Sequence, residues 1–188
     1  MFPEVGERDP AVAKPQVRYP GLRPVCFFSP YEVAAWAIIG QRIRIVQAAK
    51  IKNRMATELG PTVEVHGVRE HAFPGPEKLE TLDDFPGLTP PKIEYLRRLA
   101  REATEEKLDA AHLRSLPERE ALARLEELPG IGPFSAGLIL LRGAGAPDLI
   151  PTREPRLRKA VTIAYALEAP PTPEELQRLA QTWRPYRT

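Results

Sequence analysis

A glycine-rich turn within residues 126–143 carries the strongest chemical signal in this sequence. Gly130 and Gly132 can both take a positive φ, and neither has a Cβ that would keep the backbone away from a ligand. Gly132 opens the next helix, with Pro133 at its first position, where the missing N–H costs nothing. Such a helix start presents free N–H groups and a positive dipole end, which predicts an anion site. The alternative is a helical corner whose glycines serve packing alone.

The Leu-Pro-Gly-Ile-Gly run at 128–132 is typical of the helix-hairpin-helix element, which we expect over about residues 117–142. This element holds a DNA phosphate through its backbone, so the predicted contacts are Gly130, Ile131 and Gly132. A similar run at 85–92 lacks the second glycine. It predicts a turn between two helices rather than a second phosphate site.

Composition excludes several classes of protein. The 188 residues are 43% hydrophobic and 28% charged, enough for one good-sized core. No apolar run approaches the roughly 20 residues of a membrane span, and the first residues lack a signal-peptide pattern. The single cysteine, Cys26, excludes an internal disulfide and a cysteine-ligated iron–sulfur cluster. The three histidines form no zinc pattern. We expect a cytoplasmic protein that contacts no membrane.

Basic residues are clustered, although the net charge is only +2. The clusters are Arg42, Arg44, Lys50, Lys52 and Arg54; Lys92, Arg97, Arg98 and Arg101; and Arg153, Arg156, Arg158 and Lys159. Each follows a turn or helix start, where nucleic acid could be bound. Solvated helix faces are the alternative explanation.

Local patterns predict an all-α protein. The proline-rich residues 1–28 predict an extended N-terminal arm, followed by a helical domain over 29–188. Capping boxes predict helices that begin after Ser29, Ser115 and Thr172, each of which has a Glu three residues later. Gly40 divides segment 30–59 into two helices joined near 41–44, with apolar side chains, Ile45 among them, facing inward. Residues 60–76 predict a loop or short strand.

The sequence as a whole resembles the helix-hairpin-helix DNA glycosylase superfamily, specifically its bacterial 3-methyladenine DNA glycosylase II type. Besides the hairpin, the motifs that carry the resemblance lie in order at residues 19–24, 29–32, 37–41, 71–74, 92–96 and 183–187. The resemblance implies a two-lobed helical domain whose cleft accepts a flipped-out base. We expect the chain to lack the family's extra N-terminal β domain.

The resemblance also implies a catalytic carboxylate. In the family an aspartate about a helix-length after the hairpin stabilises the cationic sugar while water attacks the N-glycosidic bond. Glu154 stands at that place in this sequence, which is a departure from the family pattern. Asp148 aligns ahead of the catalytic position, and we interpret it as a structural helix cap.

Two further segments match family sites. Relatives that also cleave the strand carry a lysine where this chain has Phe134, so the resemblance predicts hydrolysis alone. Phe134 and Leu138 would form an apolar wall against the flipped base, with a buried core phenylalanine as the alternative. Gln41 and Arg42 match the loop whose side chain fills the gap in the duplex. By position Arg42 is that wedge, and a surface arginine is the alternative.

The family hairpin also holds a monovalent cation through backbone carbonyls, which here would be those of Glu126, Leu128 and Ile131. We expect no other cofactor.

In the family a further helix, which supplies another pocket aromatic, follows the segment that matches residues 183–187. Here we expect either a compact variant with an open pocket or a lost C-terminus.

The combined expectation is a monofunctional glycosylase that excises alkylated bases, 3-methyladenine among them, in base excision repair. Its partner would be double-stranded DNA with a damaged base, bound by a monomer near the nucleoid. The alternatives are a catalytically weak or inactive relative that senses lesions, and a helix-hairpin-helix module that serves a protein complex.

Overall fold

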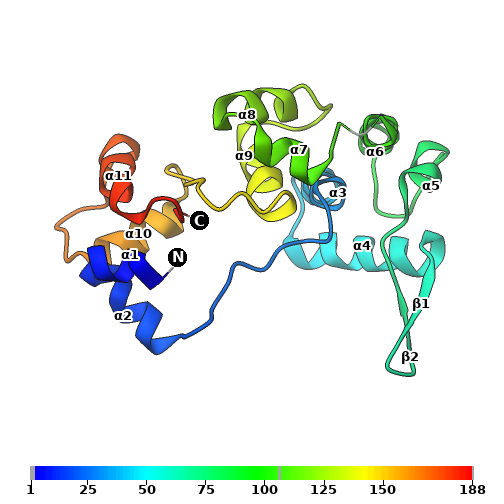
Figure 1. The fold of residues 1–188 in the computed structure, drawn as a ribbon. Helices are drawn as coiled ribbons and strands as arrows, with labels where there is room; N and C mark the ends of the chain where they lie inside the picture. The colour runs from blue at the N-terminus through cyan, green and yellow to red at the C-terminus, as the bar shows by residue number, and fades with distance from the viewer. Residues whose placement is uncertain (1–2, 106, 188) are drawn as a thin grey trace. The chain divides into compact units, whose positions relative to one another are not determined.

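The computed structural model describes residues 3–105 and 107–187, which group into two compact units (Figure 1). The hairpin unit is the continuous segment Cys26–Gly145. The terminal unit combines the chain up to Val25 with the chain from Ala146 onward. This division differs from the expected arm over 1–28 and single domain over 29–188, because the N-terminal residues pack with the C-terminal ones.

The hairpin unit is built around one buried helix. Its elements are α3 (Pro30–Gly40), α4 (Ile45–Leu59), β1 (Thr62–Val65), β2 (Val68–His71), α5 (Pro76–Glu80), α6 (Pro90–Thr104), α7 (Ala110–Ser115), α8 (Glu118–Glu126), α9 (Pro133–Leu138) and the π-helical η1 (Ile139–Gly143). Helix α3 packs against α4, α6, α9 and η1, and its Ile38 and Ile39 are fully buried.

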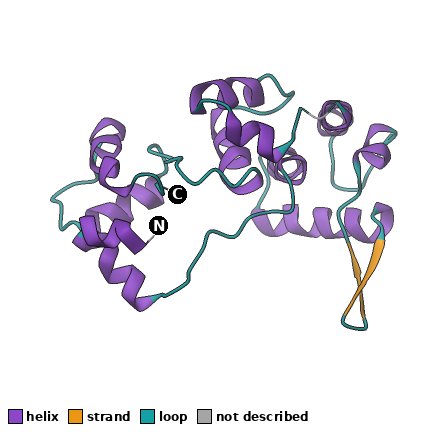
Figure 2. Ribbon diagram, in the orientation of Figure 1, coloured by secondary structure: helices purple, strands orange, loops and turns teal. Residues whose placement is uncertain are grey.

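The all-α prediction is confirmed, since helices dominate the described residues (Figure 2). The strands β1 and β2 form one small antiparallel hairpin in which Thr62 pairs with His71. None of the helices in the described ranges is both long and apolar enough to cross a bilayer.

Two of the three predicted capping sites are confirmed. The Ser29 hydroxyl accepts from the Glu32 N–H at 3.2 Å, and Thr172 forms a full capping box with Glu175. The box at Ser115 is wrong. Ser115 ends α7 and donates to the His112 carbonyl, and α8 begins only after Pro117.

The turn that divides segment 30–59 is confirmed, but the inward position of Ile45 is wrong. Ile45 is 72% exposed in the first turn of α4. It lies before the stretch of that helix that carries the buried Ala48, Ile51 and Met55. The break at Gly40 starts a new helix, so the apolar pattern of α3 does not continue through it.

The expected extended arm is wrong as well, because residues 3–18 form helices α1 (Pro3–Arg8) and α2 (Pro10–Arg18). Pro10 occupies the first turn of α2, and the Asp9 side chain caps that helix by accepting from the Ala11 N–H at 3.0 Å. Proline is well tolerated at a helix start, so a proline-rich sequence does not exclude short helices.

The terminal unit closes around a buried carboxylate. It also contains α10 (Pro155–Ala164), α11 (Pro173–Leu179) and the 3₁₀ turn η2 (Ala180–Trp183). Asp9, only 5% exposed, accepts hydrogen bonds from the Tyr165 hydroxyl, from Trp183 Nε1 at 2.8 Å and from the Thr182 hydroxyl at 3.1 Å. Burial raises the pKa of this carboxyl, but the hydrogen bonds outweigh burial and hold it below its ordinary value.

Replacing Asp9 with alanine is expected to lower the free energy of unfolding of the terminal unit by about 1–3 kcal/mol, because buried donors lose their acceptor. The lowered pKa makes this stabilisation complete above pH ~4, and it fades as the pH falls through the folded-state pKa. Urea denaturation at several pH values measures both effects. Asp84→Ala, which removes an exposed carboxylate, is the control. An Asp9 variant as stable as the wild type at pH 7 would contradict this account.

Candidate nucleic-acid interface and active site

The predicted hairpin is a tight turn between α8 and α9. The Ile131 N–H donates to the Leu128 carbonyl at 3.1 Å, with Pro129 and Gly130 between them. Gly130 has φ +78°, and a Cβ there would lie 2.7 Å from the ring of Tyr95. Pro followed by a positive-φ glycine is the pattern of a type II turn. Gly130 is therefore required both by its backbone conformation and by close packing.

Gly132 is glycine for a different reason. Its backbone is extended, with φ −106°, and a Cβ there would meet no atom within 4 Å. It precedes Pro133 at the start of α9, and no side chain caps that helix start. The protein leaves room for a Cβ here, so neither packing nor backbone conformation requires a glycine at this position.

The loop between α3 and α4 is tied directly to the hairpin. The Gln41 side-chain amide donates to the Gly130 carbonyl at 2.6 Å. Arg42, the next residue, is exposed and has φ +57°, a conformation that is uncommon outside glycine. The structure thus brings together the two segments predicted to contact DNA, while the wedge role of Arg42 stays a prediction.

Phe134 is 71% exposed in the first turn of α9, so its alternative reading as a core residue is wrong. Leu138, one helical turn later, is half-buried. Sequence reasoning missed two further exposed apolar residues, Ile45 at 72% and Val46 at 65%, which begin α4 just after the Arg42 loop. Three exposed apolar side chains therefore lie on or next to the two segments predicted to contact DNA.

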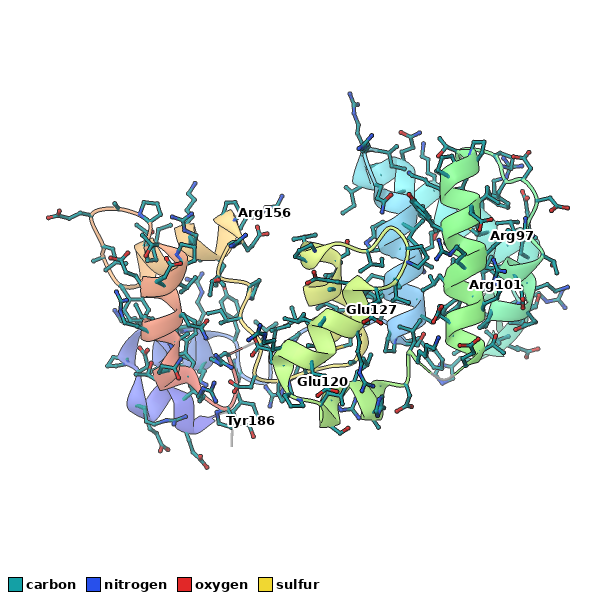
Figure 3. All side chains as sticks on the ribbon, turned by 90° about the horizontal axis from the view of Figure 1, so that it is seen from above. Arg97, Arg101, Glu120, Glu127, Arg156 and Tyr186 are labelled. Atoms are coloured by element: carbon teal, nitrogen blue, oxygen red, sulfur yellow. The ribbon has the colours of Figure 1, made fainter. Side chains whose placement is uncertain are left out.

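Glu154 lies in the terminal unit and caps α10. Its side chain accepts from the Arg156 N–H at 3.3 Å, and it is half-buried (Figure 3 labels Arg156 at this helix start). Gln41, Arg42 and Phe134 belong to the hairpin unit. A glycosylase would need Gln41, Phe134 and Glu154 to converge on one cleft, and this stays a prediction.

Asp148 is structural, as expected, but it does not cap a helix. It accepts from Arg187 Nε at 2.6 Å and pairs with Arg184 at 3.4 Å. Arg187 is 5% exposed, and a buried guanidinium needs such acceptors. The helix-capping role that sequence reasoning gave Asp148 belongs to Glu154.

The predicted cation ligands, the carbonyls of Glu126, Leu128 and Ile131, all lie at the turn between α8 and α9. The Leu128 carbonyl accepts from the Ile131 N–H, which leaves it a second lone pair. Uncharged carbonyl oxygens suit a hard cation, so these residues fit the predicted site. Across the described residues, no group of three His, Cys, Asp or Glu side chains could hold a metal.

The second basic cluster is not one surface. Arg97 donates to the Glu80 carbonyl at 3.2 Å and lies 4.0 Å from Asp83, and Arg101 pairs with Glu94 at 3.8 Å (Figure 3). These arginines fit the alternative reading as a solvated helix face. Lys92, by contrast, is 8% exposed, so its expected place on a basic surface is wrong.

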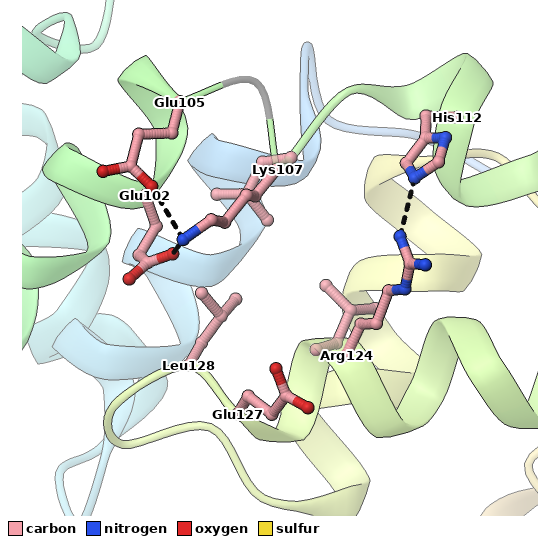
Figure 4. Close-up of a pocket in the computed structure, with 9 residues that line it drawn as sticks. Glu102, Glu105, Lys107, His112, Arg124, Glu127 and Leu128 are labelled. Carbon is pink, nitrogen blue, oxygen red and sulfur yellow. Dashed lines mark hydrogen bonds and ion pairs between the residues drawn. The ribbon is translucent and has the colours of Figure 1, made fainter.

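A pocket of about 580 Å³ lies between α6, α7 and α8 (Figure 4). Most of its charged side chains are paired with one another: Lys107 bridges Glu102 and Glu105 at 2.6 and 2.7 Å, and Arg124 lies 2.8 Å from His112 Nε2. Neither Phe134 nor Leu138 lines it. It is therefore distinct from the predicted apolar base pocket.

No protein-family model matches the chain. It is 25% identical over 191 residues to the DNA-3-methyladenine glycosylase of Bacillus subtilis, covering all of this chain and 63% of that protein. The fold matches 3-methyladenine DNA glycosylase from Archaeoglobus fulgidus with TM-score 0.76 and 24% identity, over 99% of this chain and 64% of the other. It also matches the Schizosaccharomyces pombe 3-methyladenine DNA glycosylase in complex with abasic DNA with TM-score 0.69 and 19% identity, over 98% and 91%.

Proposed function

We propose that this chain, which has the helix-hairpin-helix DNA glycosylase fold, is a monofunctional DNA glycosylase that excises alkylated bases such as 3-methyladenine. The observation on which this proposal rests is the hairpin. A Cβ at Gly132 would meet no protein atom, and the Gly130 carbonyl accepts a hydrogen bond from the loop that carries Arg42. Similarity to the Bacillus subtilis glycosylase over the whole chain supports the substrate class. The chain spans 63% of that relative.

The proposed chemistry needs few groups. An alkylated purine already carries positive charge, so it leaves with little help from an acid. The departing base leaves cationic character on the deoxyribose, and the Glu154 carboxylate stabilises that charge while water attacks. Phe134 supplies an apolar surface for stacking with an electron-poor base, and Leu138 lines the same side of α9.

The proposed partner is double-stranded DNA. The backbone of Gly130, Ile131 and Gly132 would hold a phosphate at the start of α9, a contact that positions the protein without reading sequence. Arg42 would fill the space left by the flipped base. A structural neighbour in complex with abasic DNA supports DNA as the partner. We propose that the protein acts as a monomer on DNA in the cytoplasm.

Incubation with methylated duplex DNA is expected to release methylated adenine and leave abasic sites without strand cleavage. Phe134 replaces the amine that a covalent imine requires. Borohydride is therefore expected to trap no cross-link, whereas a strand-cleaving glycosylase gives one under the same conditions. A trapped complex would mean that another lysine, Lys159 for example, acts as the nucleophile.

A non-catalytic lesion-binding protein is the second candidate. The observation that favours it is the cap at α10, since Glu154 has a structural role there that requires no catalysis. Such a protein would bind duplexes with an abasic-site analogue and release no base. The two assays together separate the candidates.

A further inference from the structure

Lys92 is a buried lysine held by main-chain carbonyls. Its Nζ donates to the Ile39 carbonyl at 2.7 Å and to the Gln41 carbonyl at 2.8 Å, and 8% of the residue is exposed. No carboxylate of the described chain pairs with it. Burial lowers the pKa of the ammonium. The Lys92 ammonium, which loses hydration free energy on burial, thus lies at the end of α3. The last carbonyls of a helix lack partners there and carry negative partial charge.

Helix α6, which carries Lys92, also contacts the hairpin through Tyr95. Tyr95 lies one turn after Lys92, on the same face of α6, and its ring packs against Gly130. The Gln41 side-chain amide completes this set of contacts by donating to the Gly130 carbonyl. Lys92 therefore binds the backbone carbonyl of Gln41, and the Gln41 side chain binds the carbonyl of Gly130. The ring of Tyr95 packs against the same glycine.

We propose that Lys92 is a positioning residue that couples the Arg42 loop to the phosphate-binding hairpin, so that the wedge enters the duplex in register with the bound phosphate. The inference rests on the function proposed above. Lys92 touches neither DNA nor the reacting atoms and acts through the backbone of Gln41. An ammonium suits this role because it offers several donors from a compact centre to two carbonyls of one turn.

The variant Lys92→Met keeps much of the side chain's length and removes the ammonium. Because the variant loses two charge-assisted hydrogen bonds, single-turnover excision of methylated adenine paired with thymine is expected to fall roughly 10- to 100-fold. Excision of the same base placed opposite an abasic site is expected to fall far less, because flipping there costs little. Lys78→Met removes an exposed lysine of the same unit and is the control.

A merely structural role would slow excision equally on both duplexes, and that outcome overturns the proposal. Gln41→Leu removes the hydrogen bond between Gln41 and Gly130 without disturbing the core. Adding Lys92→Met to it should slow excision little further if both act through one contact chain. Additive losses would show that Lys92 and Gln41 act independently, against the proposal.

A third measurement requires no catalysis. A duplex with 2-aminopurine beside an abasic-site analogue gains fluorescence when an inserted side chain opens the stack. The wild type is expected to raise this signal and Lys92→Met to lose most of the rise at saturating protein. Equal signals from both proteins refute the positioning role. A wild type that opens the stack but releases no base refutes the enzyme proposal alone.

Discussion

Replacing Glu154 with glutamine is expected to slow the release of methylated adenine about 100- to 1000-fold, the usual cost of losing a preorganised electrostatic contact in a transition state. Glutamine keeps the shape and a carbonyl oxygen, but it removes the negative charge that we propose stabilises the developing sugar cation. Binding to an abasic-site analogue should survive, because the hairpin and Arg42 are untouched. Single-turnover base release and a binding titration measure the two effects.

The cap that Glu154 provides to α10 calls for a second variant. Glu154→Asp restores the residue of the resembled family, keeps the charge and is a good helix cap. It should retain activity or raise it if the longer side chain is only tolerated. A Gln variant as fast as the wild type would mean that Glu154 serves the helix alone. The protein would then use another carboxylate or be no enzyme.

A bulky residue at Gly132 is expected to weaken DNA binding without weakening the fold. A Cβ at this position meets nothing in the protein, and its backbone conformation suits any residue, so Gly132→Leu should unfold at the wild-type temperature. The side chain would block the approach of a phosphate. Loss of a hydrogen bond to a charged group corresponds to roughly 10- to 100-fold in affinity.

Damaged and undamaged duplexes should lose affinity alike, because phosphate contacts position the protein without specifying sequence. Gly137→Ala is the matched control, since Gly137 also has open space around it but lies further along α9. That variant should keep full affinity and gain a little helix stability. Unchanged binding by Gly132→Leu would remove the hairpin from the interface.

The hairpin could be predicted because its signal is local. A proline and two glycines determine the turn, the positive φ of Gly130 and the start of α9, and no distant residue is needed. The same local pattern recurs at Phe85–Leu88, where Gly87 has φ +91° and the Leu88 N–H donates to the Phe85 carbonyl. The predicted turn between helices at that place is confirmed.

Three of the errors concern residues whose partners lie far away in the chain. Nothing near Lys92 shows that it reaches the end of α3, since its partners precede it by about fifty residues. Asp148 looked like a cap because Arg187 could not be paired with it from sequence. The N-terminal prolines looked extended because Asp9 finds Tyr165 and Trp183 only in the folded unit.

The terminal unit is assembled from both ends of the chain, and this has a consequence for synthesis. Asp9 leaves the ribosome more than 150 residues before its partners Tyr165, Thr182 and Trp183. The continuous segment Cys26–Gly145 can fold while the ribosome is still working. Val5 of α1 and the Asp9 carboxylate stay without their folded partners during that time, so the terminal unit can close only after the residues that follow Ala146 have been made.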